Sequence, residues 1–229
     1  MPKKRKKKRP QRSKSRSLRG PNGQKVILVE YSITFEPLKN KDLTALPKAV
    51  QQQIVDLFDL LAADPRAAIP IIQELLEQYP HIALLHNHLA RAYSLLRDDE
   101  NADRVTFETY KKFPDYLFGR INYAQVCLRN GEPERVPAIF NNTFDLKMLY
   151  PQRSEFHVSE VMNFCYIMAW YFSTIGKMDT ANIYYDTMRR VDPDDPMVAQ
   201  VERLLLPEYS LDRLKSAIQG EARKRGILK

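Results

Sequence analysis

Apolar residues recur every three or four positions through most of the chain, from Ala49 to Leu206. This spacing is typical of amphipathic helices, and it predicts seven or more helices of about 10–16 residues. Two helix starts are marked by Asp64-Pro65 and Asp195-Pro196, in which an N-cap residue precedes proline at the first helical position. We therefore expect an all-α fold in which residues 197–206 form a terminal helix.

The segment 25–38 departs from this spacing, because its apolar and polar residues alternate. Alternation predicts a β-strand, and one face of the strand collects the apolar residues Ile27, Val29, Tyr31, Ile33 and Phe35. A single strand is not stable alone, so the segment must pair or pack. Three partners are open: the alternating segment 144–150, the same strand of a second molecule (a dimer through residues 27–35), or the first helical hairpin, along which the segment would lie as an extended arm.

Two prolines, Pro80 and Pro114, lie 34 residues apart. The positions between them hold His86-x2-Leu89-Ala90-x2-Tyr93, followed by Ala102. Small residues suit the point where two helices approach most closely, and Pro114 ends the second helix because proline cannot continue one. This pattern resembles the tetratricopeptide repeat, a 34-residue helix–turn–helix.

The same register recurs on both sides of this copy, so the resemblance covers roughly residues 47–193. A C-terminal copy ends at Pro193 and contains Cys165-x2-Met168-Ala169-x2-Phe172, with Gly176 at the turn between its helices. A weaker copy contains Tyr123-Ala124 and Phe140, and a degenerate first copy contains Ala68 and Ile72. The extra length between the copies falls in residues 141–155.

The resemblance implies a solenoid of stacked helical hairpins whose first helices line a concave surface. It assigns that groove to residues of three copies: Asn87, Arg91, Ser94, Phe118, Asn122, Gln125, Arg129, Asn163, Tyr166 and Trp170. Amides can bond a peptide backbone, an arginine can hold a carboxylate, and Tyr166 and Trp170 can grip an apolar side chain. The alternative for these two aromatic residues is a place in the core. Asn87 and Asn163 stand where members of the family that clamp a terminal carboxylate have lysine.

Positive charge is concentrated in residues 1–25, which hold 12 of the 36 Lys and Arg residues and no Asp or Glu. The remaining residues have 24 basic and 28 acidic side chains, a net charge of −4, so the net charge of +8 belongs to this tail. The tail has few apolar residues to bury and is expected to be disordered. It is either a solvated extension or a contact to RNA or DNA phosphates through Lys3, Lys4, Arg5, Lys6, Lys7, Lys8 and Arg9.

Other kinds of site have little support in the sequence. No apolar run reaches the roughly 18 residues of a transmembrane helix, and no apolar region of a signal peptide follows the basic start. Cys127 and Cys165 fall at core positions of helices, which indicates buried thiols in a reducing compartment. His86 and His88 point to opposite sides of a helix, so they cannot chelate one ion. We expect no catalytic residues, no metal and no cofactor.

The sequence thus divides into a disordered basic tail (1–25), an extended arm or strand (26–46), a helical repeat domain (47–206) and a C-terminal helix with a basic end (207–229). The expected function is that of a non-enzymatic intracellular adaptor, cytoplasmic or in a eukaryote nuclear, that binds a protein segment in the groove. The alternative is an RNA- or ribosome-associated factor that uses the tail. No membrane contact is expected.

Overall fold

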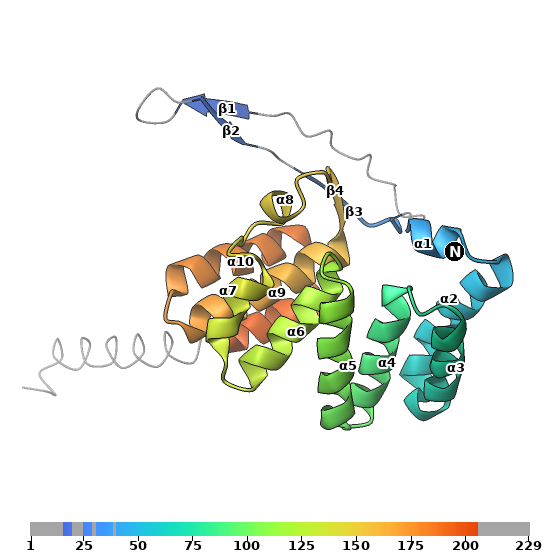
Figure 1. Ribbon diagram of the computed structural model, residues 1–229. Coiled ribbons are helices and arrows are strands. Elements are labelled where there is room, and N and C mark those ends of the chain that lie inside the picture. Colours follow the sequence, from blue (N-terminus) through green and yellow to red (C-terminus); the bar gives the residue numbers. More distant parts are fainter. Residues whose placement is uncertain (1–15, 20–24, 29–30, 39, 206–229) are drawn as a thin grey trace, which may run out of the picture.

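The computed structural model describes residues 16–19, 25–28, 31–38 and 40–205 of the 229-residue chain (Figure 1). In these residues the fold is mostly helical, with short strands before the first helix and one more strand between two helices. The predominantly helical character that the apolar spacing predicts is confirmed. The C-terminal helix expected in 207–229 and the basic run Lys3–Arg9 lie outside the described residues.

The helices follow one another through most of the chain. Their bounds are α1 Lys41–Thr44, α2 Lys48–Ala63, α3 Pro65–Gln78, α4 Ala83–Leu95, α5 Asp99–Lys112, α6 Leu117–Arg129, the 3₁₀ helix η1 Pro133–Arg135, α7 Val136–Ile139, α8 Leu146–Leu149, α9 Val158–Thr174 and α10 Met178–Val191. Residues 196–205 are also helical, which agrees with the terminal helix predicted for 197–206.

Local signals in the sequence account for several of these boundaries. The side chain of Asp64 accepts a hydrogen bond from the backbone N–H of Ala67 at 3.0 Å, and Pro65 is the first residue of α3, as predicted. The helices α3 and α5 end two residues before Pro80 and Pro114. Gly176 has φ +75° in the turn after α9, a conformation that favours glycine.

Consecutive helices pack side by side, α2 with α3, α4 with α5 and α9 with α10 (Figure 1). Contacts also join the first helices of neighbouring pairs: α2 contacts α4, α4 contacts α6, and α6 contacts α9. The partner of α6 is short, because only η1 and α7 follow it. Neighbouring helices thus lie side by side, while a solenoid of stacked tetratricopeptide-like hairpins stays a prediction.

Two pairs of short strands account for the N-terminal segment. β1 (Arg16–Arg19) pairs antiparallel with β2 (Lys25–Leu28), and β3 (Ser32–Thr34) pairs parallel with β4 (Glu155–His157). In the second pair Ile33 lies opposite Phe156. Both pairings are made within the chain; pairing between two copies stays a prediction.

Three expectations about this segment need correction. The segment 144–150 is not its partner strand, because Asp145 caps the helix α8 by accepting from the N–H of Met148 at 2.8 Å. The partner is β4, which lies further along the same insert.

Phe35 does not turn inward and is 64% exposed, because β3 ends at Thr34. Tyr31 and Ile33 do pack against the core. Disorder was expected throughout 1–25, whereas residues 16–19 form a strand that pairs with 25–28; the rest of that tail up to residue 24 lies outside the described residues.

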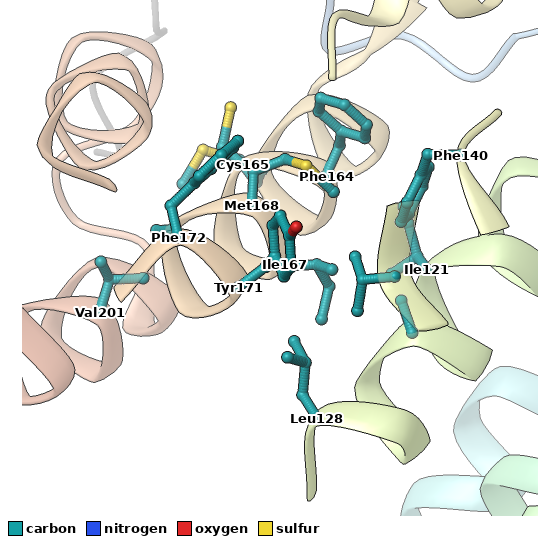
Figure 2. Close-up of a cluster of buried hydrophobic side chains, with 14 of the residues drawn as sticks. Ile121, Leu128, Phe140, Phe164, Cys165, Ile167, Met168, Tyr171, Phe172 and Val201 are labelled. Atoms are coloured by element: carbon teal, nitrogen blue, oxygen red, sulfur yellow. The ribbon is translucent and has the colours of Figure 1, made fainter. Parts of the chain in front are cut away.

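The buried apolar residues form two separate clusters. The N-terminal cluster joins α2–α5 and is aliphatic, with Leu46, Ile54, Leu57, Leu61, Ala68, Ile72, Leu75, Ile82, Leu85, Leu89, Ala90, Ala92 and Val105. The C-terminal cluster joins α6 to residues 196–205 and includes Phe156. It is rich in aromatic and sulfur-containing side chains, among them Phe140, Phe164, Cys165, Met168, Tyr171 and Phe172 (Figure 2).

Candidate binding pocket

A pocket of about 520 Å³ opens where the two halves of the helical stack meet. Its wall comes from α2, α4, α5, α6 and the first turns of α9. Six of the eight principal groove residues expected from the sequence line it: Asn87, Arg91, Asn122, Gln125, Arg129 and Asn163. Ser94 and Phe118 line it as well. The structure therefore brings together residues that are up to 76 positions apart in the chain.

Helix α4 supplies one wall because its two faces differ. Leu85, Leu89 and Ala92 are buried in the N-terminal cluster, whereas Asn87, Arg91 and Ser94 follow a second stripe at spacings of three and four residues. On α6, Asn122, Gln125 and Arg129 repeat that stripe. The two stripes meet where the side-chain amide of Asn122 donates to the side-chain oxygen of Asn87.

The two arginines of the pocket differ in their partners. Arg129 forms an ion pair with Asp103 of α5, so its charge is largely balanced. Arg91 is exposed and makes no ion pair with any residue that the structure describes. The pocket therefore presents one positive charge that a ligand's carboxylate can neutralise.

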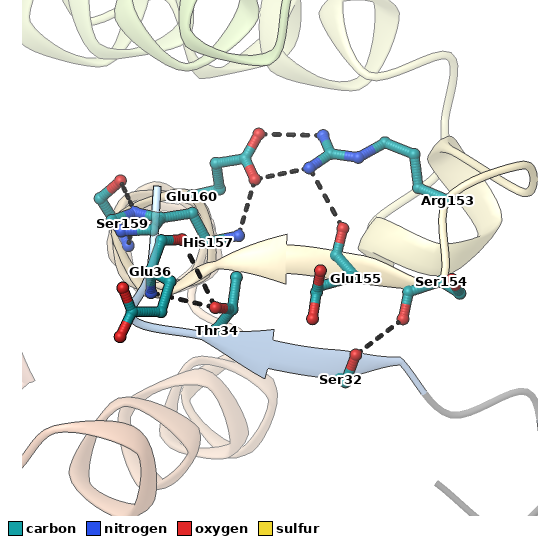
Figure 3. Close-up of polar contacts among 9 residues, drawn as sticks. All are labelled: Ser32, Thr34, Glu36, Arg153, Ser154, Glu155, His157, Ser159 and Glu160. Atoms are coloured by element: carbon teal, nitrogen blue, oxygen red, sulfur yellow. Dashed lines mark hydrogen bonds and ion pairs between the residues drawn. The ribbon is translucent and has the colours of Figure 1, made fainter. Parts of the chain in front are cut away.

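Figure 3 shows the polar contacts at the start of α9, which directly follows β4, the strand paired with β3. The N-cap of α9 is His157, whose Nδ1 accepts from the backbone N–H of Ser159 at 3.2 Å, while Glu160 accepts from the N–H of His157 at 2.9 Å. Arg153 then holds both carboxylate oxygens of Glu160, at 2.9 and 2.6 Å. These contacts fix the first turn of α9, from which Ser159 and Asn163 line the pocket. The side-chain amide of Asn163 donates a hydrogen bond to the Ser159 carbonyl at 2.8 Å.

Tyr166 and Trp170 are not part of the pocket wall. They lie one and two turns further along α9, half-buried against the C-terminal cluster, with their rings edge to face at 6.0 Å. Burial raises the pKa of Tyr166. The structure thus separates these two residues from the other predicted groove residues.

Several residues of the pocket could not be assigned from the repeat register. Phe58 of α2 and Tyr116, which precedes α6, add aromatic surface, and burial raises the pKa of Tyr116. Phe58 was missed because the first copy of the repeat is degenerate. Asp103 was missed because it lies on a second helix of a hairpin, whereas the register assigned only first helices to the groove.

His88 is the most unusual of the residues that were missed. It is 1% exposed, and neither ring nitrogen has a hydrogen-bond partner among the described residues. The ring of Phe58 stands edge to face with it at 4.6 Å. Burial, with a smaller contribution from the charge of Arg91, lowers the pKa of His88 to about 4. Its spacing of three from Leu85 and four from Ala92 was the available signal that it faces inward.

The other candidate chemistry is dispersed. In the described part of the chain no three His, Cys, Asp or Glu side chains gather as they would around a metal ion. Cys127 and Cys165 are buried free thiols, as expected, and burial raises the pKa of Cys165 to about 12. His86 faces away from the pocket and bonds the Pro80 carbonyl at 2.9 Å. The pocket is therefore equipped to hold a ligand by amides, by aromatic surface and by Arg91, which has no ion-pair partner in the part of the chain that the structure describes.

No protein-family model matches the chain, and no curated protein matches it. The helices that the structure describes include none that is long and apolar enough to cross a membrane. The properties of the pocket are therefore the basis for a functional interpretation.

Proposed function

We propose that the protein is a non-enzymatic adaptor that binds an extended segment of a partner protein in this pocket. The observation that carries the proposal is the convergence of Asn87, Asn122 and Gln125 with Arg91 and aromatic surface in one cavity. Side-chain amides both donate to and accept from a peptide backbone. A cavity of about 520 Å³ lies within the roughly 300–1,000 Å³ that is usual for ligand sites.

The arrangement of the helices supports the same proposal. The helices α4 and α6 begin at Ala83 and Leu117, 34 residues apart, and α5 and η1 begin at Asp99 and Pro133 with the same spacing. This is the period of a tetratricopeptide repeat. We accordingly propose that 47–206 is a solenoid of this kind, whose third hairpin is shortened and whose fourth is displaced by the insert before α9.

The test uses exposed residues of the pocket, because their truncation spares the fold. We expect Arg91→Ala and Gln125→Ala to lose capture of a partner from nuclease-treated native lysate, with melting temperatures unchanged. Arg66→Ala is the matched control, since Arg66 is exposed on α3 and lies outside the pocket wall. Truncating a residue central to such a site typically costs about 2 kcal/mol of binding. Equal capture of one partner by all three variants would exclude this pocket as its site.

The charge of the tail supports a second candidate, an RNA- or ribosome-associated factor. Twelve basic and no acidic residues in 1–25 favour salt-dependent binding to phosphates. Removing residues 1–25 should abolish RNA affinity and its salt dependence. Arg91→Ala should leave both unchanged, which separates the tail from the pocket.

A further inference from the structure

We infer that His88 is a recognition residue of the pocket: together with Arg91 it binds an acidic side chain of the bound segment, and it takes up a proton as that side chain enters. This inference rests on the proposed function, since it assumes a peptide in the pocket. It adds the chemistry of the residue that is recognised and a dependence of binding on pH.

The first argument is the unsatisfied imidazole. His88 lies in the wall of the pocket, is 1% exposed, and has both nitrogens without a partner among the described residues. Buried polar groups in native proteins are nearly always hydrogen-bonded, so an exception needs an explanation. A ligand group that completes the hydrogen bonds of this ring provides one.

The second argument is charge. Arg91 lies three residues from His88 on α4, about one turn away, and both line the cavity. The other charged residues of the wall, Asp103 of α5 and Arg129 of α6, are paired with each other. The nearest residue from α2 is Phe58, α3 contributes nothing to the wall, and α9 contributes only the neutral Ser159 and Asn163. The wall therefore carries an excess of one positive charge, which a carboxylate balances.

The proton uptake follows from these two contacts. Before a ligand binds, burial and the charge of Arg91 keep His88 neutral at pH 6 and above. A carboxylate that pairs with Arg91 screens that charge and gives the imidazolium an acceptor, so the pKa of His88 rises in the complex. The proton comes from solvent and adds to the ring nitrogen that faces the carboxylate; no covalent bond changes otherwise.

A random decapeptide display library tests the inference, with the full-length protein as bait at pH 6. Peptides that also bind an Arg91→Glu variant are removed, because the basic tail of both baits captures acidic peptides unspecifically. We expect the remaining peptides to share an Asp or Glu at one position. No remaining peptides would overturn the proposed function itself. Peptides without a shared acidic residue would leave that function intact and overturn the inference.

The strongest binder and its Glu→Gln or Asp→Asn counterpart then test the role of His88. If the pKa of His88 rises from about 4 to about 7 on binding, affinity for the acidic peptide falls about tenfold between pH 6 and pH 8. The neutral counterpart should bind equally at both values. NMR of the histidine ring carbons should show the rise at His88 directly.

A His88→Gln variant should still bind the acidic peptide at pH 8 but lose the gain at pH 6. His86→Gln is the matched control, because His86 lies on the same helix and bonds the Pro80 carbonyl outside the pocket. A tenfold change that persists in His88→Gln, or a His88 titration that the peptide leaves unmoved, would overturn the inference.

Discussion

The two halves of the helical stack bury different kinds of side chain. The N-terminal cluster is made of Leu, Ile, Val and Ala, whereas the C-terminal cluster contains stacked and edge-to-face aromatic rings, such as Phe144 with Tyr171 at 5.6 Å and Phe140 with Phe164 at 5.6 Å. Aromatic rings fill space with few side chains, which suits a region where a short α7 and an insert replace a full helix. In the N-terminal half, the paired helices α2/α3 and α4/α5 pack through aliphatic side chains, without buried aromatic rings in the cluster.

The boundary between the halves is polar beside the pocket, while elsewhere along it Tyr110 of α5 stacks on Tyr123 of α6, with ring centroids 4.8 Å apart. Thr106 and Thr109 of α5 are buried there, and Asn87 bonds Asn122 across it. No buried apolar residue connects the two clusters within the described chain. A buried polar side chain costs free energy unless its polar atoms are hydrogen-bonded. The polar residues at this boundary therefore do not form a continuous apolar core. The pocket opens at this point, which indicates why the site lies between the clusters and not within one of them.

The largest predicted effect comes from removing one core side chain in each half. Phe140→Ala and Leu61→Ala, both at fully buried positions, should each cost about 3–5 kcal/mol of unfolding free energy. Trp170, the one tryptophan of the chain, packs against the C-terminal cluster, so its fluorescence reports on that half alone. In denaturant, Leu61→Ala should lower the midpoint seen by circular dichroism more than the midpoint seen by fluorescence. Coincident midpoints in this variant would show that the polar boundary does not uncouple the halves.

The sequence was informative about each element but less so about their assembly. Helix boundaries followed from proline, aspartate and glycine signals that act within a few residues, as at Asp64 and Gly176. The groove residues on α4 and α6 were found because those helices keep the 34-residue period. The partner strand β4 could not be found, because three residues of alternation in an irregular insert carry no signal. Tyr166 and Trp170 lie outside the wall of this pocket, half-buried against the C-terminal cluster, so their place in a binding groove stays a prediction.

The second prediction is that acid weakens the N-terminal half first. The pKa of His88 is about 4 in the folded protein and 6.5 in a free chain, so the unfolded state binds more protons between these values. Stability is therefore complete above pH 6.5 and falls as pH drops toward 4, by about 3 kcal/mol in total. Unfolding of wild type and His88→Gln at pH 7 and pH 4.5 measures this difference. Parallel losses in both proteins would contradict the assigned role of His88.

The third prediction concerns Gly119, where α6 faces α5 at the boundary. A Cβ at Gly119 of α6 would lie 3.4 Å from the ring of Tyr116 and 3.7 Å from the Cα of Tyr110, so alanine fits and a larger side chain does not. Gly119→Leu should cost about 1–3 kcal/mol by separating α5 from α6. Gly119→Ala is the matched control and should be neutral or stabilising, since alanine gains up to about 1 kcal/mol of helix propensity. Equal stability of the two variants would show that the helices part here without strain.

The smallest effects compare one ion pair from each half. Arg153 and Glu160 have side chains that are 31% and 13% exposed, form two hydrogen bonds, and hold the cap of α9; the arginine also lies 4.1 Å from the ring centre of Phe156. Arg104 and Glu108, spaced i,i+4 on α5, are 54% and 58% exposed. Water screens the second pair, so Arg104→Ala should cost about 0.5 kcal/mol or less. Arg153→Ala should cost about 1–2 kcal/mol, because it removes a partly desolvated pair and loosens a capping box.

Double-mutant cycles with Glu160→Gln and Glu108→Gln isolate the pairwise energies. If the two coupling energies are equal, the insert does not depend on Arg153, and the position of Ser159 and Asn163 in the pocket must be set by the packing of α9 on α6 instead.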